Sequence, residues 1–338
     1  MKILILSDFF LSGQTTHVLE LAKQLQGLGV EPHIAFGTIH SKLFWSDYVP
    51  YLTRFKVSFS HNTDMLSLYS LCRIWQPDLI HAQSSTLFQR AQQLSSRLKI
   101  PYVVTCHGLG FNQPRYRQPL SLASCVIAIG PKVAEELQEI SDKVEVIFNG
   151  IDTDHFCPPE RITSPRKELL YVGRLERKRL EPLKHLVVAN AILTGKPLKI
   201  ISNWNPYLPG TRFYPWQTNL VPHLQASGIV AACGRTAREA LSCGNAVILM
   251  QQAYDGIITP QLVKDERFDF SGNLGRFPLS DVQYDLNALL ARPHRLKKLQ
   301  RWGRTYSVSH LSSKQMAEKT MALYEQVLAE KKKPHRSR

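Results

Sequence analysis

Short, continuous apolar runs alternate along the first half of the chain with segments whose apolar residues recur at helical spacing. Lys2 to Ser7 is such a run, and Thr16 to Leu28 follows it with Val18, Leu21 and Leu25 on one face. A strand that is apolar throughout is typical of a parallel sheet covered by helices on both faces. The pattern therefore predicts α/β structure built from strand–helix units.

The alternation continues along the chain and then restarts after a loop from Cys157 to Lys167. In the first half, further strands are expected at Val30 to Phe36, Val57 to Ser60, Leu79 to Ala82, Tyr102 to His107, Cys125 to Ile129 and Val144 to Phe148, with helices at Leu66 to Trp75, Leu87 to Leu98 and Lys132 to Ile140. In the second half, strands are expected at Leu169 to Val172, Leu198 to Ser202, Gly228 to Ala232 and Ala246 to Met250, with helices at Lys184 to Leu193, Thr236 to Cys243, Asp281 to Leu290, Pro293 to Trp302 and Ser313 to Glu330.

This organisation predicts a first Rossmann-like domain over residues 1–157 and a second over residues 166–310, with parallel sheets that face each other across a cleft. A helix over residues 311–330 follows, which can cross back to the first domain, and residues 331–338 form a basic tail. In such sheets ligands bind beyond the carboxyl ends of the strands, so we expect the chemistry in the cleft.

The chain is strongly basic, and most of the excess charge lies at its C-terminus. Lys and Arg outnumber Asp and Glu by 42 to 27, which gives a formal net charge of +15, and residues 291–338 hold 13 of these cations against three glutamates. This end is either a solubilising extension or a surface that docks reversibly on an anionic membrane. The candidate docking residues are Arg292, Arg295, Lys297, Lys298, Arg301 and Arg304, with Trp302 as an anchor. No nucleic-acid-binding motif accompanies them, so we expect no nucleic-acid partner.

Apolar runs and cysteine spacing indicate where the protein works. The longest apolar runs, such as Ala246 to Met250, fall far short of the ~20 residues that span a bilayer. The apolar start of the chain stops at Ser7, which is too early for a signal peptide. The six cysteines form no C-x-x-C pair, so we expect neither structural zinc nor disulfides. These features predict a cytoplasmic protein, with peripheral association with the inner face of the membrane as an option.

Two positions in the first half combine a strand end with candidate chemistry. Gly13 precedes the first amphipathic helix, whose N-terminal N–H groups suit an anion, although a single glycine does not make a dinucleotide fingerprint. His107 ends a strand and is followed by Gly108, which lets a ligand approach closely. His81 lies at a similar strand end and is the weaker candidate.

The second half offers two elements suited to a phosphate. Arg174 and Lys178 follow a strand and a glycine, and this pair of cations could neutralise a diphosphate. Gly234, Arg235 and Thr236 form a second strand-to-helix turn, with the helix expected to open at Thr236. Glu239 lies one turn in and could accept hydrogen bonds from ribose hydroxyls.

Asp152 and Asp154 have the spacing of a D-x-D metal-binding motif. They lie in the connection between the two halves, where Asx-type turns are common, so we expect no metal site there.

Taken in order, these pieces resemble the family 4 glycosyltransferases of the GT-B fold. The matching segments are Gly13 with Thr16 to Ala22, Pro77 to Ala82, Thr105 to Gly108, Asn149 to Phe156, Gly173 to Leu175 with Lys178, and Glu239 with Ala240 and Gly244. The resemblance implies two Rossmann-like domains, with a nucleotide-diphosphate sugar bound mostly by the second domain and a glycan or lipid-linked acceptor by the first.

The resemblance also implies roles for single residues. Arg174 and Lys178 match the cations that bind the diphosphate, Glu239 the ribose ligand, and His107 the histidine that contacts the donor sugar. Gly13 matches the loop that closes over the diphosphate. The family transfers the sugar with retention, needs no metal or other cofactor, and includes enzymes of envelope polysaccharide synthesis.

One motif departs from the family pattern. The first glutamate of the family's E-x7-E motif would fall at residue 231, which is Ala231 here. A subset of bacterial relatives shares this departure and also carries segments like Tyr254 to Gly256 and Phe270 to Gly272. Two alternatives therefore stay open beside the transferase: a binding or scaffold protein that has lost activity, and a sugar-nucleotide epimerase of the same fold.

Overall fold

The structure is a computed structural model, and it describes every residue except 11, 162–165, 218 and 333–338. It divides into two compact units, one formed by Met1–Gly150 together with the segment from Ser313 onward, and the other by Ile151–Ser312. The first domain was expected to run to residue 157. It ends earlier because Ile151 is fully buried in the core of the second unit, where its N–H donates to the Leu311 carbonyl (2.9 Å). The expected tail lies almost entirely outside the described residues.

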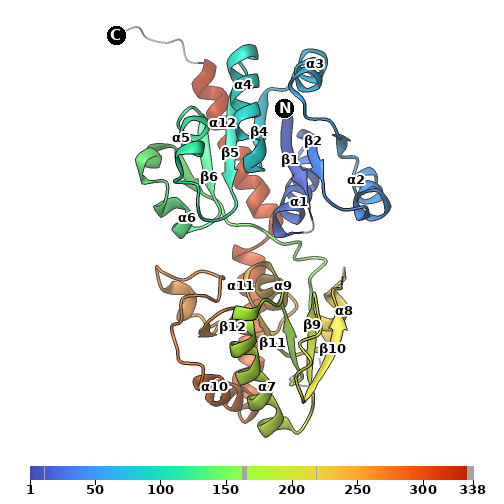
Figure 1. Cartoon of the computed structure of the whole chain (residues 1–338), viewed down its shortest axis with the longest axis vertical. Coiled ribbons are helices and arrows are strands. Elements are labelled where there is room, and N and C mark those ends of the chain that lie inside the picture. The colour runs from blue at the N-terminus through green and yellow to red at the C-terminus, as the bar shows by residue number, and fades with distance from the viewer. Residues whose placement is uncertain (11, 162–165, 218, 333–338) are drawn as a thin grey trace. The chain divides into compact units, whose positions relative to one another are not determined.

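The first unit contains a seven-stranded sheet in which all paired strands run parallel (Figure 1). Its order is β3-β2-β1-β4-β5-β6-β7. The strands are β1 (Lys2–Phe9), β2 (Glu31–Ile39), β3 (Ser58–Ser60), β4 (Leu79–Ala82), β5 (Tyr102–Cys106), β6 (Cys125–Ala128) and β7 (Val144–Val146).

Helices cover both faces of this sheet. They are α1 (Gly13–Gly27), α2 (Val49–Arg54), α3 (Met65–Trp75), α4 (Phe88–Leu98), α5 (Pro114–Ser121), α6 (Pro131–Glu135) and the C-terminal α12 (Ser313–Lys332). Successive β1 residues face opposite sides, so Ile3 packs in the cluster that includes α1 and α12, and Leu4 packs in the cluster with α3, α4 and α5. The last helix is thus part of the first unit.

The second unit contains a six-stranded sheet of order β10-β9-β8-β11-β12-β13. Its strands are β8 (Leu169–Val172), β9 (Leu198–Ser202), β10 (Thr211–Pro215), β11 (Ile229–Ala232), β12 (Ala246–Met250) and β13 (Tyr254–Ile257). Five strands are parallel, but β13 pairs antiparallel with β12 at the edge, which corrects the expectation of an all-parallel sheet. The sequence did not indicate β10, which is only partly buried, or β13, which contains an aspartate and a glycine.

The helices of the second unit are α7 (Leu180–Thr194), α8 (Val221–Ala226), α9 (Gly234–Ser242), α10 (Asp281–Leu290) and α11 (Pro293–His310). Helix α11 continues past Trp302, where a break was expected before Gly303. Gly303 lies inside this helix, and a Cβ there would come within 2.9 Å of the Leu241 side chain on α9, which explains why a glycine occupies the position. Short 3₁₀ or π turns complete the chain: η1 (Phe44–Tyr48), η2 (Ser85–Leu87), η3 (Gln138–Lys143), η4 (Arg177–Arg179) and η5 (Leu262–Lys264).

Both sheets confirm the predicted Rossmann-like architecture. In each, the strand order reverses beside the first strand, between β1 and β4 in one unit and between β8 and β11 in the other. Ligands of doubly wound sheets bind at the carboxyl ends of the strands next to this reversal. Each unit therefore has one predicted site edge. None of the helices in the described part of the chain is long and apolar enough to cross a membrane.

Candidate functional site

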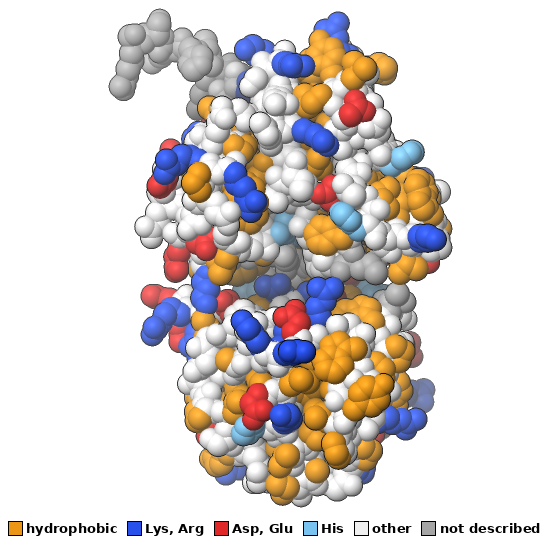
Figure 2. Space-filling model, viewed as in Figure 1, with side chains coloured by type: hydrophobic (Ala, Val, Ile, Leu, Met, Phe, Trp, Pro, Cys, Tyr) orange, Lys and Arg blue, Asp and Glu red, His pale blue; other side chains and the backbone are white. Residues whose placement is uncertain are grey.

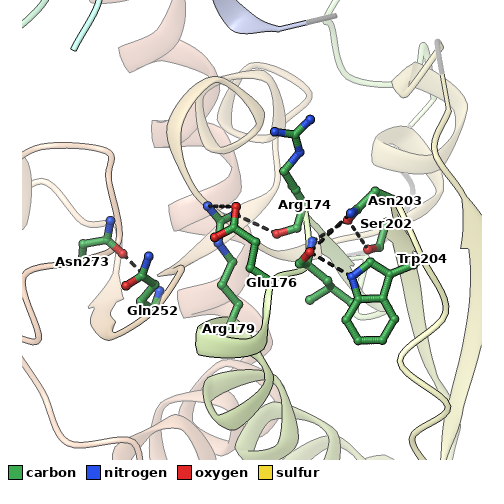
Figure 3. A network of polar contacts seen from close by, with 9 residues as sticks. Arg174, Glu176, Arg179, Ser202, Asn203, Trp204, Gln252 and Asn273 are labelled. Carbon is green, nitrogen blue, oxygen red and sulfur yellow. Dashed lines mark hydrogen bonds and ion pairs between the residues drawn. The ribbon is translucent and has the colours of Figure 1, made fainter. Parts of the chain in front are cut away.

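The loop after β8 carries the first candidate cation and is firmly held. Leu175 is buried, its N–H donates to Asn203 Oδ1 (2.6 Å), and its carbonyl accepts from Trp204 Nε1 (2.9 Å). Asn203 and Trp204 follow β9, so the ends of two neighbouring strands fix the loop (Figure 3). The Arg174 side chain is exposed and points away from these contacts in Figure 3. The loop thus presents a guanidinium from a rigid base.

A second arginine, Arg179, was missed by the sequence analysis. It ends the short turn η4, and its Nη1 donates to the Arg174 carbonyl (2.8 Å) while Nη2 lies 4.0 Å from Glu176 Oε1. Its guanidinium also contacts the Gln251 side chain after β12, with the Gln251 oxygen accepting. Arg179 therefore ties the loop after β8 to the end of β12. Only its place in a run of three cations, Arg177 to Arg179, marked it in the sequence.

Lys178 lies in the same turn and is exposed. Neither Lys178 nor Arg174 forms an ion pair within the part of the chain that the structure describes. Several Lys and Arg side chains gather at one end of the second unit on the face shown in Figure 2. Charges without a protein partner at a strand edge are available to an anionic ligand.

The turn between β11 and α9 differs in detail from the expectation. Helix α9 begins at Gly234, two residues before the expected start at Thr236, because Cys233 adopts the extended conformation of an N-cap residue. The Gly234 N–H already donates to the Phe270 carbonyl (2.5 Å), so this group is not free to bind an anion. An anion at this helix start would instead depend on Arg235 and Thr236.

Glu239, the expected ribose ligand, is 5% exposed and pairs with Arg235, whose Nε donates to Oε1 (2.7 Å). The two residues lie one turn apart on α9, where such pairs meet. Arg238 on the same helix lies over the Phe270 ring (4.6 Å to the centroid). Burial, together with the nearby Arg235 charge, lowers the pKa of Arg238 to about 10. The start of α9 therefore carries two arginines near the Glu239 carboxylate, and Asp269 lies close to Arg238.

Ala231 lies inside β11 and is fully buried, paired with Ile248 and Tyr171 of the neighbouring strands. A carboxylate at this position would be desolvated in the core. Of the two segments that accompany the departure at Ala231, Tyr254 to Gly256 lies in the edge strand β13. Asp255 is buried and accepts from the N–H groups of Leu274 (3.0 Å) and Arg276 (3.1 Å).

In the first unit, the site edge contains Gly13 and His107. Gly13 starts α1 behind the N-cap Ser12, is exposed, and has open space where a Cβ would be. The His107 ring lies 4.8 Å from that of His17, and its Nε2–H donates to Gln83 Oε1 (2.6 Å). Burial lowers the pKa of His107 to about 3, so the ring is neutral near pH 7.

The D-x-D segment is organised as a turn. Asp152 Oδ1 accepts from the N–H groups of Asp154 (3.1 Å) and His155 (3.0 Å), which is the Asx-type arrangement. Within the described ranges, no cluster of three or more His, Cys, Asp or Glu residues has the spacing of a metal site.

The structure thus groups the expected residues by unit. Arg174, Lys178, Gly234, Arg235, Thr236 and Glu239 lie at or beside the carboxyl edge of the second sheet, and Gly13 and His107 lie at that of the first.

Comparisons with known proteins bear on the family and the fold of the chain. Residues 11–155 match the family model described as Glycosyltransferase Family 4, whereas no curated protein sequence matches the chain. A glycosyltransferase from Rickettsia africae is similar in structure over 97% of this chain and 98% of its own, with 17% sequence identity and a TM-score of 0.76.

Two further solved structures share the architecture. Anabaena Alr3699/HepE in complex with UDP is similar over 96% of this chain and 100% of its own, with 14% identity and a TM-score of 0.74. A putative UDP-N-acetylglucosamine 2-epimerase from Listeria monocytogenes is similar over 98% of this chain and 97% of its own, with 14% identity and a TM-score of 0.62. At such identities the likeness is one of fold.

Proposed function

We propose that the chain is a GT-B glycosyltransferase of family 4 type that moves a sugar from a UDP- or GDP-sugar to a glycan or lipid-linked acceptor, with retention and without a metal ion. The observation that carries the proposal is the rigid loop after β8, which presents Arg174 beside Lys178. Neither cation forms an ion pair in the described chain, so both are free to meet a diphosphate.

Charge on the leaving diphosphate is the central problem of this reaction. As the bond to the sugar breaks, negative charge develops on the phosphate oxygen, and fixed cations stabilise the transition state more than the ground state. Arg174 and Lys178 supply this charge in the proposal, and Gly13 supplies a backbone that a phosphate can approach. The leaving phosphate oxygen takes the proton of the acceptor hydroxyl, so the mechanism needs no separate protein base.

The remaining residues are proposed to bind the donor. Glu239 accepts from ribose hydroxyls, which is compatible with its bond to Arg235 because a carboxylate accepts several hydrogen bonds. His107, held neutral by burial, contacts the donor sugar. The UDP complex of Anabaena HepE supports a uridine donor, and the test below includes both bases.

A thermal-shift screen against UDP- and GDP-sugars tests the donor site. At 100 times its dissociation constant, a ligand adds about 2.7 kcal/mol to the stability of the folded state. We expect one donor to raise the melting temperature of the wild type and of Lys184→Ala, whose lysine pairs with Glu181 outside the site. Lys178→Ala should lose most of the shift. Absence of any shift with every nucleotide sugar would contradict the proposal.

The same samples separate the two alternatives. Binding with no release of nucleoside diphosphate would favour the scaffold protein. Formation of an epimerised sugar nucleotide without an acceptor would favour the epimerase, whose fold a Listeria neighbour shares.

We also propose that the second unit docks on anionic membranes, which suits a lipid-linked or envelope acceptor. Arg292, Arg295, Lys298 and Arg301 are exposed at three-residue spacing on or just before α11, and they form what we call the basic stripe. Three of the expected docking residues, Lys297, Trp302 and Arg304, do not belong to it, and Lys297 is only partly exposed. Arg304 Nη1 donates to the carbonyls of Thr153 (2.7 Å) and Phe156 (3.1 Å), and Trp302 is half-buried and stacked on Tyr306.

Vesicle sedimentation tests the basic stripe. Arg295→Gln combined with Lys298→Gln should weaken binding to anionic vesicles, whereas Lys184→Gln should not. Binding should also fall steeply as salt rises, because the attraction is electrostatic. Equal binding to neutral and anionic vesicles would contradict the docking proposal.

A further inference from the structure

A buried glutamine, Gln83, connects three parts of the site edge in the first unit. It directly follows β4, beside the reversal of strand order, and is 1% exposed. We propose that Gln83 is a positioning residue that fixes the tautomer and orientation of His107, so that the Nδ1 lone pair accepts a hydroxyl of the bound sugar. The link to the sugar rests on the proposed function, whereas the tautomer does not.

The hydrogen bond between the two side chains decides which ring nitrogen carries the proton. His107 Nε2 lies 2.6 Å from Gln83 Oε1, and an amide oxygen can only accept. The proton of the neutral ring therefore lies on Nε2, and Nδ1 holds a lone pair. Nδ1 is buried and has no hydrogen-bond partner within the described chain. Buried acceptors are almost always satisfied, so this nitrogen calls for a donor group, which a hydroxyl of the bound sugar supplies in the proposal.

The Gln83 amide lies between the rings of two histidines. Its nitrogen lies 3.3 Å from Nδ1 and 3.2 Å from Nε2 of His81, and its oxygen faces His107. The backbone of Gln83 is held as well. Its N–H donates to the Leu6 carbonyl (2.8 Å), and its carbonyl accepts from Gln14 Nε2 (3.0 Å). Since Gln14 lies in the first turn of α1, Gln83 joins His107 to the segment that starts at Gly13.

The connection extends to the C-terminal helix. The His81 ring lies between Tyr324 of α12, whose hydroxyl is 2.5 Å from Nδ1, and Thr105 of β5, whose hydroxyl is 2.7 Å from Nε2. His81, expected from the sequence as a weaker chemical candidate, therefore supports Gln83 rather than facing a ligand. The resulting chain of contacts runs from α12 through His81 and Gln83 to His107.

Nitrogen-15 NMR of the histidine rings tests the proposal directly, because the two neutral tautomers have different ring-nitrogen shifts. The His107 signals are assigned by their loss in His107→Gln. In the wild type we expect one tautomer, with Nε2 protonated and Nδ1 not. A wild-type His107 protonated on Nδ1 would overturn the proposal without any variant.

Two substitutions distinguish positioning of the His107 ring by Gln83 from a purely structural role of Gln83. Gln83→Met removes the acceptor at similar length and should abolish the single-tautomer signature. Gln83→Glu keeps an acceptor at Nε2 and should preserve the signature at a pH above the pKa of the ring, which the carboxylate raises. The control Gln93→Met changes an exposed glutamine of α4 and should have no effect. An unchanged tautomer in Gln83→Met would refute the positioning role.

Activity provides the readout for the link to the sugar. If the sugar donates to Nδ1, Gln83→Met should lower kcat/KM for the donor, and Gln83→Glu should restore it at a pH where the His107 ring is neutral. If the wild type and both Gln83 variants lack transferase activity while wild-type His107 is protonated on Nε2, the result would count against the proposed function and leave the positioning role intact. A normal kcat/KM in Gln83→Met with an altered tautomer would overturn the link to the sugar.

Discussion

Substitution of Tyr324 by Phe removes one hydroxyl from the interior of the first unit. Tyr324 is fully buried on α12, and its hydroxyl lies 2.5 Å from His81 Nδ1. The ring of Phe fills the same space, so packing is kept and only the hydrogen bond is lost. The His81 nitrogen would then be buried without this partner, which costs about 1–3 kcal/mol.

Hydrogen exchange measures this loss of stability locally, in the segments of the first unit around Tyr324. A loss of about 1–3 kcal/mol corresponds to exchange about 5- to 150-fold faster in segments that open with the unit, since 1.4 kcal/mol is a factor of ten. We expect this acceleration in peptides that cover β4 and α12. The control Tyr69→Phe removes a hydroxyl with no hydrogen bond in the described chain and should change little. If Tyr324→Phe exchanges like the wild type, the proposed anchoring of α12 through His81 is wrong.

Three further predictions concern catalysis, metal and pH. Arg174→Ala and Lys178→Ala should each raise the activation barrier by about 2.7–4 kcal/mol with the fold intact, and wild-type turnover in both would place the diphosphate elsewhere. Activity should survive EDTA, because Asp152 caps a turn; rescue of a chelated enzyme by Mn²⁺ would argue for a metal. Burial lowers the pKa values of His81 and His107 to about 3, with His107 adding to the shift of His81, so the unfolded chain binds more protons below pH 6.5. The stability of the first unit, followed by hydrogen exchange, should therefore be complete above pH 6.5 and fall towards pH 4; stability that rises on acidification would contradict this.

Buried strands were the elements best predicted from the sequence. Four strands have the bounds expected from their apolar runs: Leu79–Ala82, Leu169–Val172, Leu198–Ser202 and Ala246–Met250. A strand buried on both faces leaves a continuous apolar signal, whereas the edge strands β10 and β13 do not. The prediction that the helix from Pro293 ends at Trp302 was wrong. Close packing against α9 favours a glycine at position 303, inside α11.

The candidate site was predictable only in part. Residues placed at strand ends, such as Arg174 and His107, follow from the order of the elements. Arg179 and Gln83 do not, because their roles depend on where a long side chain ends in space. The pairing of Glu239 with Arg235 and the bonds of Arg304 to main-chain carbonyls are likewise tertiary contacts.

Release of nucleoside diphosphate tests the central claim most directly. The wild type, Lys178→Ala and the matched control Lys184→Ala are incubated with UDP- and GDP-sugars and with glycan and lipid-linked acceptors, and the freed diphosphate and the glycosylated product are quantified together. We expect one donor to yield both products in equal amounts with the wild type and the control, and far less of both with Lys178→Ala. If no donor yields diphosphate, or if Lys178→Ala turns over like the wild type, the proposed transferase site is contradicted.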